Sequence, residues 1–377
     1  MNIVYFVTED SYFLSHRLPV AINAQKLGHK VFIVTKLTGK ESLIESYGFE
    51  IVPISFNRAG LNFIQDIIIL FKLIITLRKI SANIIHNVAI KPIIIGSIAA
   101  QFCKNIRVVN AFTGMGFLFT SKLSLKYSIL SFFVKHIIKN VLKFKNIYSI
   151  VQNEGDMSFL KLNFNSDPNR IILIAGSGVD TKYFNSSLIK KNKESKKLRI
   201  VTTCRMLKDK GVLDLYEAAL ILKNRGVPCV CVFVGGLDSK NPSSIGELRL
   251  KRWIKEGVIE YHGQTSNILN ILINADIYTL VSYREGLSKS ILEAASVGLP
   301  IISTDIPASK DLVINNHNGY LVPVKNAFDL ANAIEKLVLN HDLREKFGQS
   351  SRKIVRENFS EELVSKQTTD FYDTISN

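Results

Sequence analysis

The stretch Glu285-Gly-Leu-Ser-Lys-Ser-Ile-Leu-Glu293 decides how this chain is expected to fold. A run rich in β-branched and aromatic residues, 276–283, precedes it, and Gly298 and the apolar run 300–303 follow it. This order predicts a strand, a tight loop, a helix that ends at Gly298 in a left-handed cap, and a second strand. Glu285 is then expected in the loop, and Glu293 about two turns into the helix.

A loop in this position would lie where α/β proteins bind nucleotides, in the crevice outside the carboxyl ends of parallel strands. The amino terminus of the following helix offers free N–H groups to a diphosphate. A carboxylate nearby can accept hydrogen bonds from sugar hydroxyls. Alternatively, Glu285 only complements the helix dipole and Glu293 is a solvated helix residue. The surrounding Tyr-Arg before Glu285 and Gly-Leu-Pro after the helix favour the functional interpretation.

Composition bounds the class of protein. The chain has 377 residues, which favours two domains, and its formal net charge of +16 favours an anionic partner such as nucleic acid, a membrane surface or a phosphorylated substrate. Its four cysteines lack metal-ligand or disulfide spacing, so reduced thiols in a cytoplasmic protein are expected. The apolar run 2–7 predicts a first buried strand and no signal peptide, and no apolar run is long enough to span a bilayer without charges.

The first half of the chain alternates apolar strand patterns with helical ones. Strands are expected at 2–7, 30–35 and 50–54, and a strongly apolar helix at 61–80. Such β-α alternation predicts a parallel, doubly wound sheet covered by helices on both faces.

A second helix, expected at 123–145, is amphipathic and basic. Lys135, Lys139 and Lys143 are spaced by four residues and would therefore share one helix face. A basic amphipathic helix is typical of elements that lie on a membrane surface. The alternative is a core helix with a solvated lysine face.

The second half carries a further motif in the run Arg205-Met-Leu-Lys-Asp-Lys210-Gly211, which follows a predicted strand at 198–204. Two fixed cations at a strand's end could stabilise the negative charge of a leaving nucleoside diphosphate. The alternative is a pair of surface cations.

Together these motifs resemble family 4 of the glycosyltransferases, which have the GT-B fold. The resemblance implies an α/β protein with two Rossmann-like, doubly wound parallel-sheet domains that face each other across a cleft. It implies an acceptor-binding domain at 1–185, a nucleotide-sugar-binding domain at 186–357, and a helix at 358–377 that returns to the first domain. The lysine-rich segment 189–197 would be the linker.

The resemblance also assigns roles to residues of the second domain. Glu285 would hold the donor sugar and act in catalysis with Arg205 and Lys210, and Glu293 would hold the nucleotide ribose. A turn near residue 263 would face the base. The remaining donor-binding candidates are Gly286, Leu287, Ser288, Gly263 and Thr265.

In the first domain the run Ser-His16-Arg17-Leu-Pro resembles a subset of family 4 that acts on lipid-linked glycans. The chain departs from the wider family in three places. It has no glycine pair in its first β-α turn, Cys204 replaces a glycine, and no histidine stands at 110–113, which puts the identity of any catalytic helper there in doubt. The acceptor-binding candidates are His16, Arg17, Lys91, Thr113 and Gly114.

The resulting hypothesis is a retaining glycosyltransferase. It would move a hexose or N-acetylhexosamine from a nucleotide-diphosphate donor, with UDP as the expected nucleotide, to a polyprenyl-diphosphate-linked saccharide in bacterial capsule, O-antigen or glycoprotein glycan assembly. Because the sequence has no Asp-x-Asp motif, neither a metal nor another cofactor is expected. The enzyme would be cytoplasmic and peripheral on the inner face of the cell membrane, which is anionic.

Two other function classes are compatible with parts of the sequence. A UDP-N-acetylhexosamine 2-epimerase can use the same scaffold, since fold alone does not fix function. A nucleic-acid binder is suggested only by the charge, and no zinc-finger spacing or RNP-type run supports it. The context of Glu285 and Glu293 favours the transferase.

Overall fold

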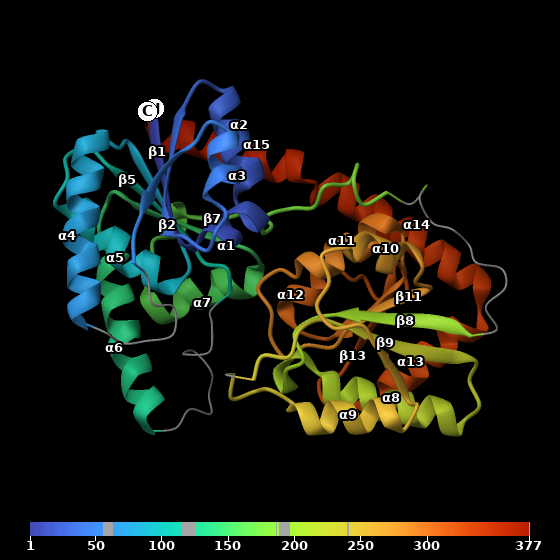
Figure 1. Ribbon diagram of the computed structural model, residues 1–377. Coiled ribbons are helices and arrows are strands. Elements are labelled where there is room, and N and C mark those ends of the chain that lie inside the picture. The colour runs from blue at the N-terminus through green and yellow to red at the C-terminus, as the bar shows by residue number, and fades with distance from the viewer. Residues whose placement is uncertain (56–62, 115–124, 186, 188–196, 240, 377) are drawn as a thin grey trace. The chain divides into compact units, whose positions relative to one another are not determined.

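The computed structural model describes residues 1–55, 63–114, 125–185, 187, 197–239 and 241–376 (Figure 1). The chain divides into two compact units. Unit 1 comprises Met1–Ser177 and Glu361–Asn377, and unit 2 comprises Gly178–Ser360. Residues 189–196 of the predicted linker lie outside the described residues.

These boundaries differ from the predicted positions after 185 and 357. Residues 178–185 lie in unit 2 because their backbone is bonded there. The N–H of Val179 donates to the Phe359 carbonyl at 2.9 Å, and the Phe184 carbonyl accepts from the Ser296 hydroxyl at 2.7 Å. Hydrogen bonds between distant segments therefore set the boundaries, and the composition of the linker does not reveal them.

Unit 1 contains a parallel sheet of seven strands in the order β3-β2-β1-β4-β5-β6-β7. The strands are near-continuous apolar runs, as expected where helices cover both faces of a sheet. Their bounds are β1 (Asn2–Glu9), β2 (Lys30–Lys36), β3 (Glu50–Pro53), β4 (Ile84–Val88), β5 (Arg107–Ala111), β6 (Ile147–Val151) and β7 (Ile171–Leu173).

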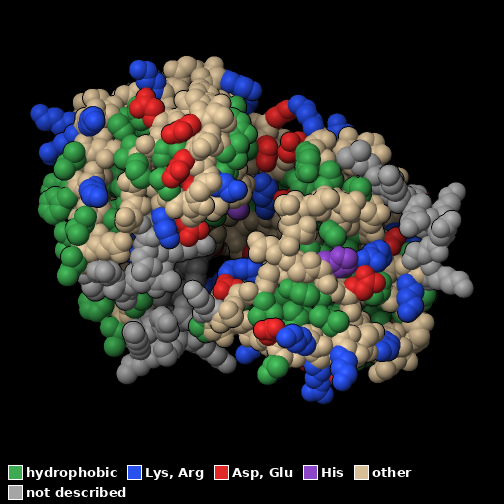
Figure 2. Space-filling model, viewed as in Figure 1, with side chains coloured by type: hydrophobic (Ala, Val, Ile, Leu, Met, Phe, Trp, Pro, Cys, Tyr) green, Lys and Arg blue, Asp and Glu red, His purple; other side chains and the backbone are tan. Residues whose placement is uncertain are grey.

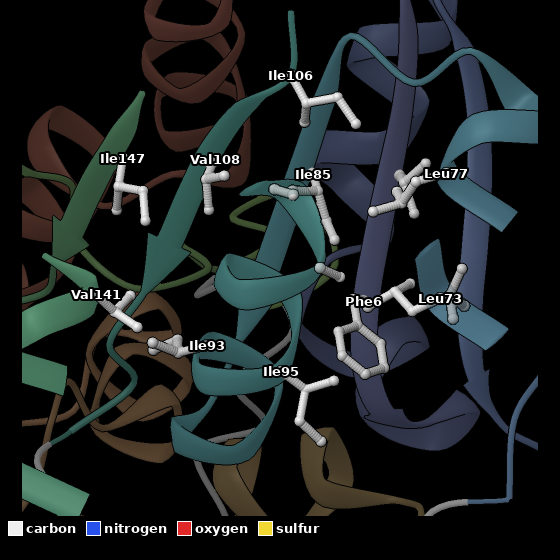
Figure 3. Close-up of a cluster of buried hydrophobic side chains, with 14 of the residues drawn as sticks. Phe6, Leu73, Leu77, Ile85, Ile93, Ile95, Ile106, Val108, Val141 and Ile147 are labelled. Atoms are coloured by element: carbon white, nitrogen blue, oxygen red, sulfur yellow. The ribbon is translucent and has the colours of Figure 1, made fainter. Parts of the chain in front are cut away.

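Alternate residues of β1 reach two separate cores of unit 1. Val4 and Phe6 pack with α4 (Phe63–Ile80), α5 (Ile90–Gln101), α6 (Leu125–Val141) and α7 (Glu154–Phe164). Figure 3 shows this cluster, with Phe6 close to Leu73 of α4. Tyr5 and its neighbours pack on the other face, with α1 (Asp10–His16), α2 (Leu18–Lys26), α3 (Glu41–Ser46) and the C-terminal α15 (Glu361–Ser376). The helix that ends the chain is therefore part of the core of unit 1.

The basic helix predicted at 123–145 is shorter than expected: α6 ends at Val141, and residues 123–124 lie outside the described residues. The chain turns after α6 because Asn146 must reach β5, where its carbonyl accepts from the Val108 N–H at 2.9 Å. Lys143 therefore lies beyond the helix end, and Lys135 and Lys139 remain on it.

Unit 2 contains a second parallel sheet, of six strands in the order β10-β9-β8-β11-β12-β13. Its strands are β8 (Leu198–Thr203), β9 (Cys229–Val234), β10 (Ile259–Tyr261), β11 (Ile277–Leu280), β12 (Ile301–Thr304) and β13 (Gly319–Val322). Its helices are the short η4 (Lys208–Lys210), α8 (Val212–Asn224), α9 (Glu247–Lys255), α10 (Ile268–Ile273), α11 (Lys289–Val297), α12 (Pro307–Lys310), α13 (Ala327–Leu339) and α14 (His341–Asn358).

Both sheets reverse their strand order at one place. The reversal lies between β1 and β4 in unit 1, and between β8 and β11 in unit 2. Neighbouring connections leave such a switch point toward opposite faces of the sheet, which opens a crevice at the carboxyl ends of the strands. The fold therefore offers one candidate binding crevice in each unit.

Candidate active site

The switch point of unit 2 brings together two residues that the sequence predicted as catalytic. Lys210 ends η4, which follows β8, and Glu285 lies in the loop after β11. The Lys210 Nζ and Glu285 Oε1 atoms are 2.6 Å apart, and the two side chains are only 20% and 16% exposed. A largely buried ion pair thus lies at the carboxyl edge of the sheet.

Backbone contacts hold this pair in place. Gly211, directly after Lys210, has a φ of +69°, and a Cβ there would lie 2.1 Å from the Val281 carbonyl oxygen. Two residues further along the loop, the Tyr283 N–H donates to the Asp209 carbonyl at 2.9 Å. The turn after β8 and the loop after β11 are therefore packed backbone to backbone, as only glycine permits at position 211.

Arg205, the other predicted cation, lies just beyond β8 and is 57% exposed. Its Nη1 donates to Asp238 Oδ2 at 2.9 Å. The sequence analysis missed Asp238, although its place just after the glycine pair 235–236, at the end of an apolar run, was a usable signal. In this structure each of the two predicted diphosphate-binding cations is therefore held by a carboxylate.

A pocket of about 450 Å³ opens beside Arg205 at the carboxyl ends of β8, β9 and β10. Thr265, a predicted donor-binding residue, lines it. Gly263 lies at its edge, where its carbonyl accepts from the Gly235 N–H at 2.7 Å. The other lining residues are Thr203, Cys204, Val234, Gly235, Gly236, Leu237, Asp238, Gln264 and Ile268.

Cys204, which stands where the family has a glycine, does not supply a nucleophile. Burial raises the pKa of its thiol to about 12, so the thiol is neutral near pH 7. Its backbone has a different role, because the Cys204 carbonyl oxygen lies 1.9 Å from where a Cβ on Gly235 would be.

Replacing Gly235 by alanine is therefore expected to destabilise unit 2 and to weaken the nucleotide binding that is predicted for this pocket. The Cβ would displace the Cys204 backbone at a φ of +143°, which costs roughly 1–3 kcal/mol or more. Thermal unfolding and UDP titration measure both effects. Gly226→Ala is the matched control, because its φ is also positive, at +71°, but no atom lies within 4 Å of the added Cβ. Equal loss of stability in both variants would show that backbone conformation alone matters.

The second carboxylate of the motif, Glu293, lies in the second turn of α11 and is partly exposed. Ser288 is the N-cap residue of this helix but makes no side-chain capping bond, since its hydroxyl bonds Ser290 at 3.0 Å. The first N–H groups of α11 are thus not capped by that side chain. Gly286 and Leu287 precede it in the same loop.

The predicted acceptor residues all follow strands of unit 1. His16 and Arg17 come after β1, Lys91 after β4, and Thr113 and Gly114 after β5. The parallel sheet therefore gathers them at its carboxyl edge.

Their environments differ. His16 stacks on Tyr12 with ring centroids 4.3 Å apart and bonds the Ser15 hydroxyl through Nδ1 at 2.6 Å. The Lys91 Nζ pairs with Asp66 Oδ1 of α4 at 2.6 Å. Arg17 is buried, with 4% of its surface exposed.

Two global features of the described residues bear on metals and membranes. Among them, no group of three or more His, Cys, Asp or Glu side chains is arranged to hold a metal ion. The expectation of a metal-independent reaction stays a prediction. None of the helices in the described part of the chain is both long and apolar enough to cross a membrane.

Comparison with known families covers most of the chain. Residues 184–354 match the family described as glycosyl transferases group 1, and residues 2–150 match the family described as glycosyl transferase 4-like. The first match lies wholly within unit 2 and the second wholly within unit 1.

Individual relatives are also glycosyltransferases by name. The chain is 26% identical to the N,N'-diacetylbacillosaminyl-diphospho-undecaprenol alpha-1,3-N-acetylgalactosaminyltransferase of Campylobacter jejuni, over 96% of this chain and 98% of that protein. It is 28% identical to the UDP-Gal:alpha-D-GlcNAc-diphosphoundecaprenol alpha-1,3-galactosyltransferase of Escherichia coli, over 74% and 72%. Its fold is similar to that of Anabaena Alr3699/HepE, solved in complex with UDP, with a TM-score of 0.80, 15% identity, and coverage of 99% and 100%.

Proposed function

The chain belongs to the GT4-like glycosyltransferases with the GT-B fold, and from this premise we propose that it moves a sugar from UDP to a polyprenyl-diphosphate-linked saccharide with retention of configuration. The observation that carries the proposal is the Lys210–Glu285 pair beside the pocket of unit 2. This arrangement offers a cation for the diphosphate and a carboxylate for the sugar at one edge of a sheet.

The donor half of the proposal is supported by chemistry within unit 2. A pocket of about 450 Å³ is large enough for a nucleoside, and Arg205 at its wall can meet the diphosphate. The amino terminus of α11, whose N-cap side chain makes no capping bond, adds N–H donors for phosphate oxygens. UDP as the nucleotide is supported by the UDP complex of the Anabaena structure and by the name of the Escherichia coli relative.

The reaction proposed for these groups follows from charge. As the bond between sugar and diphosphate breaks, negative charge grows on the leaving nucleotide, and Arg205 and Lys210 stabilise it. Glu285 accepts hydrogen bonds from the sugar hydroxyls, and Lys210 orients its carboxylate. The acceptor attacks from the face that the nucleotide leaves, so the configuration is retained.

The acceptor half of the proposal is supported by the relatives. Both enzymes quoted above carry an undecaprenyl diphosphate in the name of their substrate. An acceptor of this kind lies in a membrane, so the enzyme is proposed to attach to the anionic inner face of the cell membrane.

Two helices of unit 1 provide a surface for that attachment. Helices α4 and α6 both pack against α5 through one face and expose large apolar side chains on another. Figure 2 shows hydrophobic side chains with lysine and arginine among them along the edge of unit 1 where Figure 1 places α4. The exposed apolar residues are Ile64, Ile67, Ile68, Phe71 and Ile75 of α4, and Ile129, Phe132, Phe133 and Ile137 of α6.

The charges on these helices fit an anionic surface. Asp66 is the one acidic residue in the sequences of α4 and α6, and it pairs with Lys91. Lys135 and Lys139 are exposed on α6, and Lys143 is exposed just after it. Apolar side chains that enter the interface and lysines that meet lipid head groups stabilise such attachment together.

Replacing Lys135, Lys139 and Lys143 together by glutamate is expected to lower affinity for anionic vesicles by about 100-fold or more. Each lysine near an anionic surface contributes about 1 kcal/mol, and the substitutions also add repulsion. Cosedimentation with phosphatidylglycerol vesicles measures the effect. The control is the same charge change at Lys255, Lys346 and Lys353, which are exposed on α9 and α14 of unit 2. If the α6 variant sediments like the parent, the membrane proposal fails.

The proposed reaction is tested by incubating the protein with single UDP-sugars and a short-chain polyprenyl-diphosphate saccharide. The expected product is an acceptor extended by one sugar, with α linkage from an α-linked donor. The 2-epimerase alternative predicts instead a changed UDP-N-acetylhexosamine in the absence of acceptor. The comparisons do not favour that alternative, because the relatives described here are transferases.

A further inference from the structure

Arg17 is a buried cation that has no counter-ion among the described residues. Only 4% of the residue's surface is exposed, and none of the ion pairs in the described part of the chain includes it. Its Nη1 donates only to the carbonyl of the adjacent His16, at 3.3 Å, and its Nε has no hydrogen-bond partner among the described residues. A guanidinium has five N–H donors and no acceptor, so only acceptors or an anion can satisfy it.

The polar groups around Arg17 do not neutralise it. The His86 Nδ1 and the Tyr372 hydroxyl are 2.5 Å apart, and that hydroxyl donates to the Tyr5 hydroxyl at 3.2 Å. Burial, followed by the charge of Arg17, lowers the pKa of His86 well below its usual value. Burial also raises the pKa of both tyrosines. All three neighbours are therefore neutral near pH 7, and the cluster carries the net charge of Arg17.

The position of Arg17 is where an anion can be bound. It follows β1 at the switch point of unit 1 and is the N-cap residue of the nine-residue helix α2, without a side-chain capping bond. The neighbouring strand β4 ends at Val88, and the next residue, Ala89, has a φ of 76° and a ψ of 162°, which are strained for a residue with a Cβ. Ala89 is also the N-cap residue of α5, so the amino terminus of that helix likewise has no side-chain cap. Two helix amino termini thus meet this edge of the sheet.

An unpaired buried charge reduces the stability of a protein. Buried charges are normally paired, and replacing one that lacks a good partner by an apolar side chain of similar size is often stabilising. A chain that keeps such a group in its folded state is expected to use it for binding. The structural alternative is that Arg17 merely joins α1 to α2 through its bond to the His16 carbonyl.

We propose that Arg17 is the counter-ion of the acceptor's diphosphate, so that unit 1 recognises the lipid-linked substrate through an anion site built on this side chain and the amino terminus of α2. The proposal rests on the proposed function for the identity of the acceptor. From the sequence alone, His16, Arg17 and Lys91 were all candidates for meeting this anion. The proposal assigns the role to Arg17, since Lys91 is paired with Asp66.

The first test is thermal unfolding with inorganic pyrophosphate as the probe. UDP is present at saturation in every sample, so that the site in unit 2 is occupied. Without pyrophosphate, Arg17→Met should unfold about 2–4 °C above the parent, because it removes an uncompensated charge. Arg170→Met is the matched control and should unfold lower, since Arg170 pairs with Asp167 at 3.1 Å. Pyrophosphate should then raise the unfolding temperature of the parent but not that of Arg17→Met.

The second test distinguishes recognition of the diphosphate from recognition of the lipid chain and from binding of the donor. Farnesyl diphosphate should bind the parent at least about 10-fold more tightly than Arg17→Met, as expected when a charged hydrogen-bond partner is lost, and farnesol should bind both alike. In transfer assays Arg17→Gln should raise the KM for the lipid-linked acceptor, while the Kd for UDP stays unchanged.

The outcomes distinguish this proposal from the proposed function. If the parent neither binds UDP nor transfers sugar, the proposed function fails. The change of unfolding temperature with pyrophosphate still shows whether Arg17 binds an anion. If the parent transfers sugar but Arg17→Met unfolds below it and keeps the full pyrophosphate shift, Arg17 is a structural residue and the anion site is refuted.

Discussion

Glu285→Ala is expected to transfer sugar at least about 10³-fold more slowly than the parent while it still binds UDP, because a group that acts on the transition state contributes on this scale. The carboxylate lies in the loop after β11, is 16% exposed, and is oriented by Lys210 at 2.6 Å. The carboxylate is proposed to hold sugar hydroxyls in one geometry, and alanine offers no acceptor for them. Single-turnover transfer rates and UDP titration by calorimetry measure the two quantities separately.

Glu293→Ala is the matched comparison, since it removes the other carboxylate of the same motif. Glu293 lies on α11 and is proposed to hold the ribose, so its loss should weaken UDP binding. A Glu285→Gln protein should show the same selective loss of rate as Glu285→Ala, because the amide cannot form the ion pair with Lys210. Equal losses of UDP affinity at positions 285 and 293 would refute this division of roles.

Lys210→Ala and Arg205→Ala are each expected to lower the rate of transfer by about 10²-fold or more, because each removes a charge that is proposed to stabilise the leaving diphosphate. The loss should be larger at Lys210. Its side chain is 20% exposed against 57% for Arg205, and solvent screens an exposed charge more strongly. Lys210→Ala also leaves the Glu285 carboxylate without its partner. Pre-steady-state rates with saturating donor test this order.

Lys208→Ala is the control for these cations. Lys208 lies in the same short helix η4, but it is exposed and is not paired with Glu285. Its replacement should leave the rate near that of the parent. The reaction should also proceed in EDTA, because Arg205 and Lys210, and not a metal ion, are proposed to stabilise the charge of the leaving diphosphate. Activity that EDTA abolishes and Mg²⁺ restores would contradict that role for Arg205 and Lys210.

Much of the fold could be predicted because its signals are local. Apolar runs of strand length alternate with helical patterns, so β1, β2, β3, β8, β11 and β12 lie within a few residues of their predicted positions. Gly298 ends α11 with a φ of 96°, as its place after the Glu293 helix predicts. Helix α14 was missed because few of its residues are apolar and its buried positions include Gly348 and Ser351. The α6 boundary was wrong because a tertiary hydrogen bond decides where the chain turns.

The sequence by itself determined the parallel α/β architecture, the family, and which loops carry Arg205, Lys210 and Glu285. Spacing within a motif and the period of apolar residues are local properties, so they can be read without knowing how the strands are arranged. The resemblance to family 4 added roles for these residues, which the mutations above test.

Only the tertiary structure decided how those residues meet. Lys210 and Glu285 are 75 residues apart and form an ion pair because β8 and β11 are neighbours in the sheet. Arg205 acquires Asp238 as its partner in the same way, through the adjacent β9. Arg17 is an ordinary basic residue in the sequence, and only the folded structure shows that it is buried without a counter-ion among the described residues. Strand order and helix docking bring distant segments together, and no local pattern of side chains specifies which partners they supply.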